Sequence, residues 1–311
     1  MSALVRIAVP DLVTNSYFPA LAGEELGFYR AEGLDGRVEL LAPAPRAMAA
    51  LRDGEVDFVV TGAHTTLTAF PGFEGAKLAV TVAQGTPWLL VLRADVPATR
   101  GDVRAVKGLR IGAAPGPDAA LVRLLAEADV DPERDGVQIA RVPGTERPGA
   151  SFGVLAAEAL RAGLLDGFWA NALGSETAVR QGVGRIVVDV RRGDGPPAAR
   201  DFTFAALVTT EALIARDPQR VAAAVRGIVA AQRALRATPG RASDVGRRRF
   251  PPAAAEMIAA LVERDLSFYD PTISESSVTA LSAFARALGL LASPVAYDDV
   301  VATRFRDLWM R

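Results

Sequence analysis

Strand-like and helix-like patterns alternate through the first two thirds of this chain. Residues 5–9, 38–41 and 56–61 are short runs rich in Val and Leu, and the segments between them carry apolar residues at helical spacing. Strands that alternate with helices in this way are typical of an α/β fold with mostly parallel strands. Helical patterns dominate the last third. We therefore expect mostly parallel sheets flanked by helices and a helical C-terminal region.

Local signals predict the boundaries of these elements. A helix is expected after Asn15, with Ser16 able to cap it, Pro19 in its first turn and a left-handed Gly33 at its end. A strand and the Gly/Pro-rich loop that ends it are expected within residues 106–118. The other expected strands cover residues 78–82, 88–92, 137–142, 166–170, 185–190 and 202–209, and further helices cover residues 45–52, 119–126 and 154–161.

The composition excludes several classes of function. At 311 residues the chain exceeds what one compact core usually needs, so two lobes are expected. It carries 35 Lys and Arg against 36 Asp and Glu, a net charge of −1, which gives no reason to expect nucleic acid or an anionic membrane as partner. Without cysteine it forms no disulfide, iron–sulfur cluster or Cys-based zinc site. These features favour a small-molecule binder without cofactor or metal.

Five longer motifs together resemble a known family. They are SYFPALAGEELGFYRAEGL (16–34), LRDGEVD (51–57), VKGLRIG (106–112), DGFWAN (166–171) and FAALVTTEALIARDP (204–218). In this combination the chain resembles the ABC-transporter solute-binding proteins of the type 2 periplasmic-binding-protein fold. The resemblance is to the branch that serves nitrate, sulfonate, taurine and thiamine-precursor uptake, the NMT1-like branch, and it covers nearly the whole chain.

The resemblance implies a two-lobed molecule with two crossover strands. Lobe 1 would consist of residues 1–92 and 203–311, and lobe 2 of residues 93–202. Such lobes close over a small-molecule ligand in the cleft between them by hinge motion, and ligand contacts to both lobes favour the closed state. The implied partners are the ligand and the membrane subunits of an ABC importer, and we expect a monomer.

The start of the chain bears on whether the protein is periplasmic or cytoplasmic. Between Met1 and the strand at residues 5–9 there is no charged region, apolar run and cleavage site of a signal peptide. We expect a periplasmic protein if Met1 replaces the start of a mature fragment, and a cytoplasmic binding protein if Met1 is the native start. The most apolar late stretch, residues 221–235, is interrupted by Arg226 and Arg233, so we expect no membrane insertion.

Candidate ligand residues follow from the expected strands. In open α/β sheets a ligand binds beyond the carboxyl ends of the strands, where loops lead into helices. In the first lobe, the polar and aromatic residues at these places are Asn15, Ser16, Tyr17, His64, Thr65, Gln84 and Thr203. In the second lobe the corresponding residues are Gly116, Trp169 and Asn171. Alternation along the strand places Trp169 and Asn171 on one side, where an aromatic plate and an amide suit a small, flat or amphipathic ligand.

Each of these residues also has a purely structural interpretation. Asn15 and Ser16 fit a turn and a helix cap, and Trp169 fits the core. His64 is the only histidine, and a lone histidine is more often structural than functional. In the Gly112–Asp118 loop, backbone amides could hold an anion, or Asp118 could serve as the helix cap instead. The expected loops carry no Arg or Lys, which favours a neutral, zwitterionic or singly charged ligand.

Catalysis is the alternative to binding. The segment AHTTLTAFPGF (63–73) is similar to the histidine-bearing segment of the fungal thiamine-pyrimidine-precursor synthase, in which a histidine is the sacrificial donor and pyridoxal phosphate the co-substrate. His64 would be that donor. The cysteine-rich iron motif of that enzyme is missing, and neither Lys77 nor Lys107 lies in an expected cleft loop. We therefore expect a receptor and no enzyme.

Overall fold

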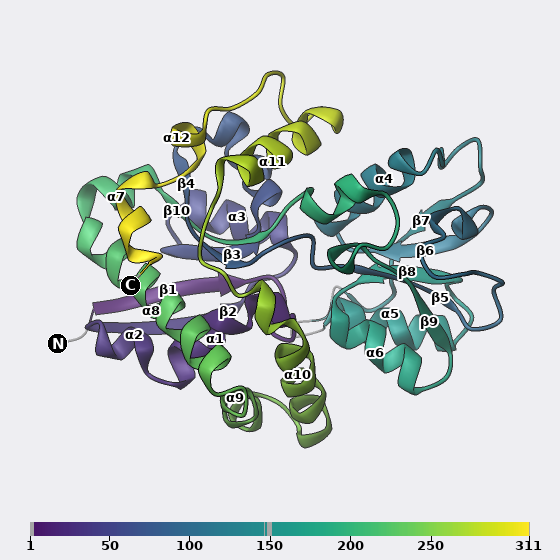
Figure 1. Ribbon diagram of the computed structural model, residues 1–311, viewed down its shortest axis with the longest axis horizontal. Coiled ribbons are helices and arrows are strands. Elements are labelled where there is room, and N and C mark those ends of the chain that lie inside the picture. Colours follow the sequence, from purple (N-terminus) through teal and green to yellow (C-terminus); the bar gives the residue numbers. More distant parts are fainter. Residues whose placement is uncertain (1–2, 146, 148–150, 311) are drawn as a thin grey trace. The chain divides into compact units, whose positions relative to one another are not determined.

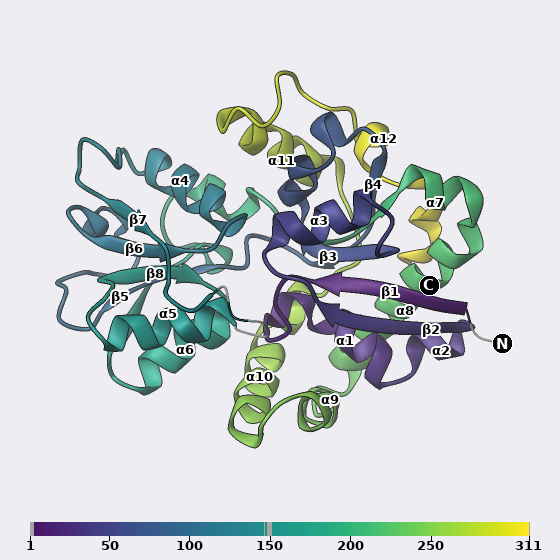
Figure 2. The ribbon, with the colours of Figure 1, turned by 180° about the vertical axis from the view of Figure 1, so that it is seen from behind.

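The computed structural model describes residues 3–145, 147 and 151–310, and the chain forms two compact units. Unit 1 consists of Met1–Gln84 and Thr203–Arg311, and unit 2 consists of Gly85–Phe202. Figures 1 and 2 show the elements of each unit from opposite sides. Met1, on which the prediction of the compartment depends, lies outside the described residues.

Unit 1 contains a five-stranded sheet in the order β2-β1-β3-β10-β4. Its strands are β1 (Ala3–Val9), β2 (Leu34–Leu40), β3 (Phe58–Gly62), β4 (Ala76–Ala83) and β10 (Ala205–Thr210). β10 runs antiparallel to both of its neighbours, and the other four strands are parallel to one another. Every residue of β3 is buried, as expected for a strand covered on both faces.

Helices cover both faces of this sheet. α8 (Pro218–Ala237) lies in front of the sheet in Figure 1 and behind it in Figure 2, whereas α3 (Ala44–Arg52) lies on the opposite side. α8 packs with α1 (Phe18–Glu25) and α2 (Phe28–Ala31). The other helices of unit 1 are α7 (Glu211–Arg216), α9 (Arg241–Arg249), α10 (Pro252–Asp265), α11 (Glu275–Ala287) and α12 (Tyr297–Val300). Its 3-10 turns are η1 (Asn15–Tyr17), η2 (Ala63–Thr68), η3 (Pro71–Phe73), η7 (Leu266–Phe268) and η8 (Thr303–Leu308).

Unit 2 repeats the plan with its own sheet, in the order β7-β6-β8-β5-β9. The strands are β5 (Leu89–Arg93), β6 (Arg110–Ala113), β7 (Gln138–Ala140), β8 (Gly167–Ala170) and β9 (Gly184–Asp189). The helices are α4 (Pro117–Glu127), α5 (Phe152–Arg161) and α6 (Ala172–Arg180), with 3-10 turns η4 (Val103–Val106), η5 (Val190–Arg192) and η6 (Pro197–Asp201). β5 is the antiparallel strand here, and buried Ala, Val, Leu and Phe residues of β5, β8, α5 and α6 form a core.

The C-terminal segment covers β4, which is an outer strand of the unit 1 sheet. Val301 forms a parallel bridge with Leu78 of β4, and the backbone N–H of Ala302 donates to the Leu78 carbonyl over 2.9 Å. The indole N–H of Trp309 donates to the carbonyl of Ala79 over 3.0 Å. Strand β4 therefore has partners on both sides, although the sheet ends with it.

The structure confirms the predicted α/β fold class, with one antiparallel strand in each sheet. The single helix expected from Ser16 to Gly33 is wrong, because the left-handed backbone of Gly27 (φ 77°) divides it into α1 and α2. Ser16 lies inside η1 and does not cap α1. No helix in the described part of the chain has both the length and the apolar character needed to cross a membrane.

The first crossover lies elsewhere than expected. The sequence predicts residues 88–92 in lobe 1, but Leu89–Arg93 forms β5, which pairs with β8 and β9 in the unit 2 sheet. The first segment of unit 1 ends at Gln84, one residue after Ala83, the last residue of β4 paired with β10. Helix α6, which follows β8 directly, is not among the expected helices.

Candidate functional site

The topology of the unit 1 sheet brings four loops together at the carboxyl ends of its parallel strands, which we call the carboxyl edge. Strands β1, β3 and β4 are parallel, so their carboxyl ends meet at the same edge, and the antiparallel β10 begins there. Ala205 of β10 lies opposite Gly62 of β3 on one side and Ala83 of β4 on the other. The predicted residues that follow β1, β3 and β4, together with Thr203 before β10, therefore share this edge.

His64 and Thr203 are in direct contact at this edge, although 139 residues separate them in sequence. The Thr203 hydroxyl oxygen lies 3.1 Å from Nδ1 of His64 and 3.4 Å from its backbone nitrogen. Both side chains are buried. The ring of Phe284 on α11 meets the imidazole edge to face, with centroids 5.5 Å apart and an angle of 82° between the planes. The imidazole is thus held by a hydroxyl and an aromatic ring.

Asn15 is held by a segment that contains none of the predicted site residues. Its side-chain nitrogen donates to a carboxylate oxygen of Asp265 over 2.5 Å, and its carbonyl accepts the hydroxyl of Tyr269 over 2.6 Å. All three residues are buried. The guanidinium of Arg264 contacts the same carboxylate at 3.0 and 3.3 Å, which balances its charge. Asn15 is therefore oriented by the end of α10 and the turn after it.

The same segment also binds Gln84. Its amide nitrogen donates to the carbonyls of Asp270 and Thr272 at 3.2 and 2.7 Å, and its backbone N–H donates to the Phe268 carbonyl at 2.8 Å. We define residues 265–272 as the strap, because this stretch joins the loop after β1 to the end of β4. The amide nitrogen of Gln84 is thereby occupied within unit 1, and a ligand contact by Gln84 stays a prediction.

The remaining predicted residues of unit 1 lie beside these. Ser16 and Tyr17 are buried in η1 next to Asn15, and Thr65 is buried in η2 next to His64. The carbonyl of Thr65 accepts the Thr68 hydroxyl over 2.7 Å, which closes the η2 turn. The edge thus gathers an amide, hydroxyls and an imidazole in a buried setting. Such groups can orient a small polar molecule through hydrogen bonds.

In unit 2 the predicted Trp169 is deeply buried. It is 1% exposed, its indole N–H donates to the carbonyl of Pro117 at the start of α4 over 3.1 Å, and the ring of Trp88 lies 6.3 Å away at 50°. These contacts give Trp169 a packing role between β8 and α4. Its contact with a ligand stays a prediction.

Asn171 caps the start of α6, and Asp118 binds backbone amides in the first turn of α4. The side-chain oxygen of Asn171 accepts the N–H of Gly174 over 2.9 Å at the start of α6. A carboxylate oxygen of Asp118 accepts the N–H groups of Gly116 and Ala119 at 2.9 Å each. Because these two amides bind Asp118, the loop does not offer them to an anion. Gly116 itself has a φ of 100°, which glycine tolerates best.

One arginine follows a strand of unit 2 in a loop outside those from which the candidate residues were taken. β9 runs parallel to β8, so both strands have their carboxyl ends on the same side of the unit 2 sheet, and Arg191 follows β9 in η5. Arg191 is 4% exposed, and its guanidinium donates to the Gly85 carbonyl over 3.0 Å. The strand end near residue 190 was predicted, so the signal was present in the sequence.

Neither lysine lies at a carboxyl edge. The ammonium of Lys77, at the amino end of β4, donates to the carbonyls of Asp298 and Asp299 at 2.9 and 2.6 Å. Lys107 precedes β6 and lies 3.0 Å from a carboxylate oxygen of Asp135. Both lysines are thus engaged at the opposite ends of the strands. Within residues 3–145, 147 and 151–310, no cluster of His, Asp and Glu has the composition of a metal site.

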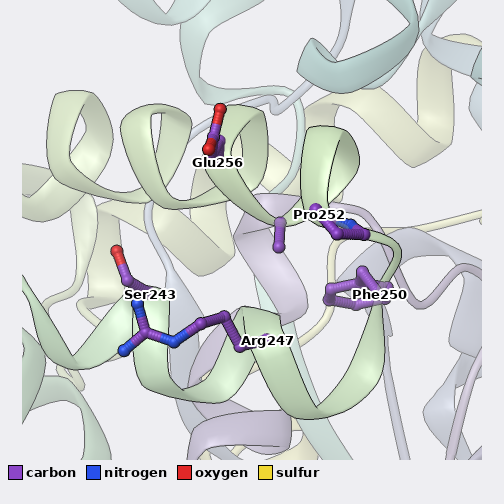
Figure 3. Close-up of a pocket in the computed structure, with 6 residues that line it drawn as sticks. Ser243, Arg247, Phe250, Pro252 and Glu256 are labelled. Carbon is purple, nitrogen blue, oxygen red and sulfur yellow. The ribbon is translucent and has the colours of Figure 1, made fainter.

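A separate groove lies between α9 and α10. Its volume is about 240 Å³, and it is lined by Ser243, Arg247, Phe250, Pro252, Ala255 and Glu256. Figure 3 shows the side chains around it. It contains none of the predicted ligand residues. The guanidinium of Arg247 is bound to Asp244 at 2.5 Å within α9.

Comparisons with known proteins agree with this architecture. The profile of the NMT1-like family matches residues 5–247. No curated protein matches the chain. Among solved structures, a protein of Bordetella bronchiseptica RB50 superposes with a TM-score of 0.79 at 20% identity, covering 99% of this chain and 96% of that one. The alkanesulfonate-binding protein SsuA of Xanthomonas axonopodis pv. citri, bound to MOPS, has a TM-score of 0.70 at 16% identity, covering 96% and 98%.

An enzyme shares the fold as well. The desulfurization enzyme DSZB superposes with a TM-score of 0.62 at 17% identity, covering 99% of each chain. At such identities the likeness shows the fold and nothing finer. The structure therefore has the type 2 periplasmic-binding-protein fold, which is compatible with both binding and catalysis.

Proposed function

The chain belongs to the NMT1-like family, and on that premise we propose that it is a solute-binding protein, which captures a small organic molecule for an ABC-type importer. One observation carries the proposal. Buried polar side chains from loops far apart in sequence gather at the carboxyl edge of the unit 1 sheet, where α/β folds bind ligands. These residues are Asn15, Ser16, His64, Thr65 and Thr203. A buried set of donors and acceptors suits a ligand that is recognised by hydrogen bonds.

Unit 2 supplies a different chemistry. In the proposal Trp169, Asn171 and Gly116 lie near the ligand, and Arg191 provides the positive charge. A buried guanidinium favours a ligand with one acidic group, because it binds a carboxylate or sulfonate through charge-assisted hydrogen bonds. The cleft between the lobes, the importer subunits, the monomeric state and the compartment stay predictions.

The enzymatic alternative is less well supported. A pyridoxal phosphate aldimine needs a lysine, and both lysines are engaged at the amino ends of strands. The protein DSZB supports only the possibility of catalysis on this fold. Substituting His64→Asn separates the two functions: a receptor loses affinity but has no turnover to lose, whereas a synthase-like enzyme loses its product.

A thermal-shift screen tests the receptor. The panel contains sulfonates, nitrate, aromatic carboxylates, amino acids, pyrimidines and pyridoxal phosphate. A ligand at 100 times its dissociation constant adds about 2.7 kcal/mol to the folded state, which is easily seen. We expect a shift with one class of singly charged organic anions.

Two variants control the screen. His64→Asn should remove the shift, and Thr279→Ala, an exposed residue on α11, should keep it. A shift that survives in His64→Asn would place the ligand elsewhere. A shift with pyridoxal phosphate alone would support the enzyme.

A further inference from the structure

The hydrogen bond between Asn15 and Asp265 determines which edge of the Asn15 amide faces away from the strap. Nδ2 of Asn15 lies 2.5 Å from a carboxylate oxygen of Asp265, and both residues are 2% exposed. Two nitrogens of the Arg264 guanidinium contact the two oxygens of the same carboxylate at 3.0 and 3.3 Å. A guanidinium in this position favours the ionised carboxylate, which can only accept hydrogen bonds.

Only one orientation of the Asn15 amide fits such an acceptor. With Nδ2 toward Asp265, the amide donates to the carboxylate. Turned by half a rotation, the amide would place Oδ1 against a carboxylate oxygen, and two acceptors would repel each other. Tyr269 fixes the backbone of the same residue, because its hydroxyl donates to the Asn15 carbonyl over 2.6 Å. The strap thus sets both the position of Asn15 and the direction of its side-chain oxygen.

The side-chain oxygen of Asn15 is an acceptor that the protein leaves open. Within residues 3–145, 147 and 151–310, Oδ1 accepts no hydrogen bond. Unlike the hydroxyl oxygens of Thr61 and Thr66, it is not completely enclosed. A ligand that binds at the carboxyl edge displaces water from this oxygen. Unless the ligand supplies a donor in its place, the acceptor is buried without a partner, which costs a hydrogen bond.

Building on the proposed function, we propose that Asp265 turns the oxygen of Asn15 toward the ligand, so that the ligand must present a hydrogen-bond donor to Asn15. Together with the acidic group of the proposed function, this defines the ligand class as small organic acids that also carry a hydroxyl, amide N–H or ammonium group. An acid whose donor is masked by methylation fits less well. Asp265 is in this view a positioning residue, which sets specificity through Asn15.

The orientation can be tested without a ligand, because the chain has only two asparagines, Asn15 and Asn171. The full chain labelled with [¹⁵N]asparagine shows two side-chain amide groups in a ¹H–¹⁵N spectrum, and Asn15→Ala identifies them. We expect one Nδ2 proton of Asn15 to resonate downfield and to exchange slowly with solvent, because it binds a carboxylate. A wild-type spectrum without such a proton would overturn the proposal.

A variant of Asp265 tests the cause of this orientation. Asp265→Leu keeps the approximate size of the side chain and removes the acceptor, so the Asn15 proton should exchange at least about tenfold faster. The Asn171 amide, which caps α6 in unit 2, should not change and serves as the internal control. Equal exchange of the Asn15 proton in both proteins contradicts the proposal. Should the leucine variant fail to fold, the wild-type spectrum still decides the orientation.

Matched ligands test the need for a donor. The probes are 3-hydroxypropionate and 2-hydroxyethanesulfonate, and the controls are their methyl ethers, which keep the acid and the oxygen but lose the donor. Calorimetric titration gives the dissociation constants. We expect at least one hydroxy acid to bind, and its ether to bind at least about fivefold more weakly. An ether that binds as tightly as its hydroxy acid would refute the need for a donor.

Two variants separate hydrogen bonding from the size of the added methyl group. Asn15→Ala should weaken the hydroxy acid and bring the two dissociation constants together, and Asp265→Leu should reduce their ratio because the amide is free to turn. A ratio that survives in Asn15→Ala assigns the discrimination to size and overturns the inference. If a screen finds a ligand without a donor, this inference fails alone. If no acid of any kind binds, the proposed function fails with it, and the ligand-free spectrum still reports the orientation of Asn15.

Discussion

At the scale of single residues, the buried ring of Tyr29 lies against three glycines that leave room for it. Tyr29 is 1% exposed, and a Cβ added at Gly23, Gly36 or Gly227 would lie 2.4–2.6 Å from its ring. Its hydroxyl has no hydrogen-bond partner in the described part of the chain. Burial and the nearby charge of Glu24 raise the pKa of Tyr29 far above its usual range, so the phenol stays neutral.

The close packing around Tyr29 predicts opposite effects on stability for two substitutions. Tyr29→Phe removes a buried hydroxyl without a partner and should leave the free energy of unfolding unchanged or raise it by up to about 1 kcal/mol. Gly227→Ala forces a methyl group against the ring and should lower it by about 1–3 kcal/mol. Urea unfolding of both variants measures this. A loss of stability in Tyr29→Phe would mean that the hydroxyl has a partner.

Because Trp169 is buried, Trp169→Phe is a better test of its role in ligand binding than Trp169→Ala. Sequence reasoning favours Trp169→Ala, with at least tenfold weaker ligand binding and an intact fold. Because the indole is 1% exposed, this variant should lose about 3–5 kcal/mol of stability. Trp169→Phe keeps most of the packing and loses the bond to Pro117. Thermal unfolding of the two variants, compared with ligand affinity in Trp169→Phe, separates packing from recognition.

At the scale of elements, Asp166 joins three strands at the amino edge of the unit 2 sheet. Its carboxylate binds the guanidinium of Arg110 at 2.9 Å and that of Arg93 at 2.7 Å, and its backbone pairs with both residues. Arg110 is the main cause that lowers the pKa of Asp166 from 3.8 to about 2. A lowered pKa in the folded state means that deprotonation favours folding.

The pH dependence follows from this direction. The contribution of Asp166 should be complete above about pH 4 and lost as the pH falls toward about 2. Because both arginines are partly exposed, we expect it to be about 1–2 kcal/mol at neutral pH. Asp166→Asn should be less stable by this amount at pH 7, and the difference should shrink at about pH 3. Urea unfolding at the two pH values measures it; a difference that does not change with pH would assign the effect to packing.

Elements were predictable where their signals are local. The strands at residues 5–9 and 185–190 carry their own apolar patterns, and the observed strands lie within a few residues of them. Site residues that follow strands, such as His64, could be found by the same rule. The strap could not, because residues 265–272 follow a helix and reach Asn15 and Gln84 only through tertiary folding. Likewise, the contact of His64 with Thr203 depends on β10 pairing with β3.

At the scale of the whole molecule, the two units differ in how the chain builds them. Unit 2 is one continuous stretch, whereas unit 1 joins the first and last parts of the chain. β10 lies between β3 and β4, and the C-terminal segment completes the edge at β4. Unit 1 therefore depends on residues up to Trp309.

Truncation tests this dependence. Deleting residues 297–311 removes the partners of the Leu78 and Ala79 carbonyls and uncovers the edge of β4. We expect a loss of at least about 3 kcal/mol in stability and aggregation through the open edge. Deleting only residues 310–311 should change little, because Met310 is 80% exposed. Light scattering and thermal unfolding measure both; a monomeric, stable long truncation would show that the edge needs no cover.

The central place of β10 also sets an order of events during synthesis. Strands β1 to β4 leave the ribosome first, yet β3 and β4 must wait for β10, which emerges roughly ten seconds later at usual rates of translation. The contiguous second unit is complete before then. For that interval the nascent chain exposes the apolar strands of its first half, so a chaperone has a defined window in which to hold it.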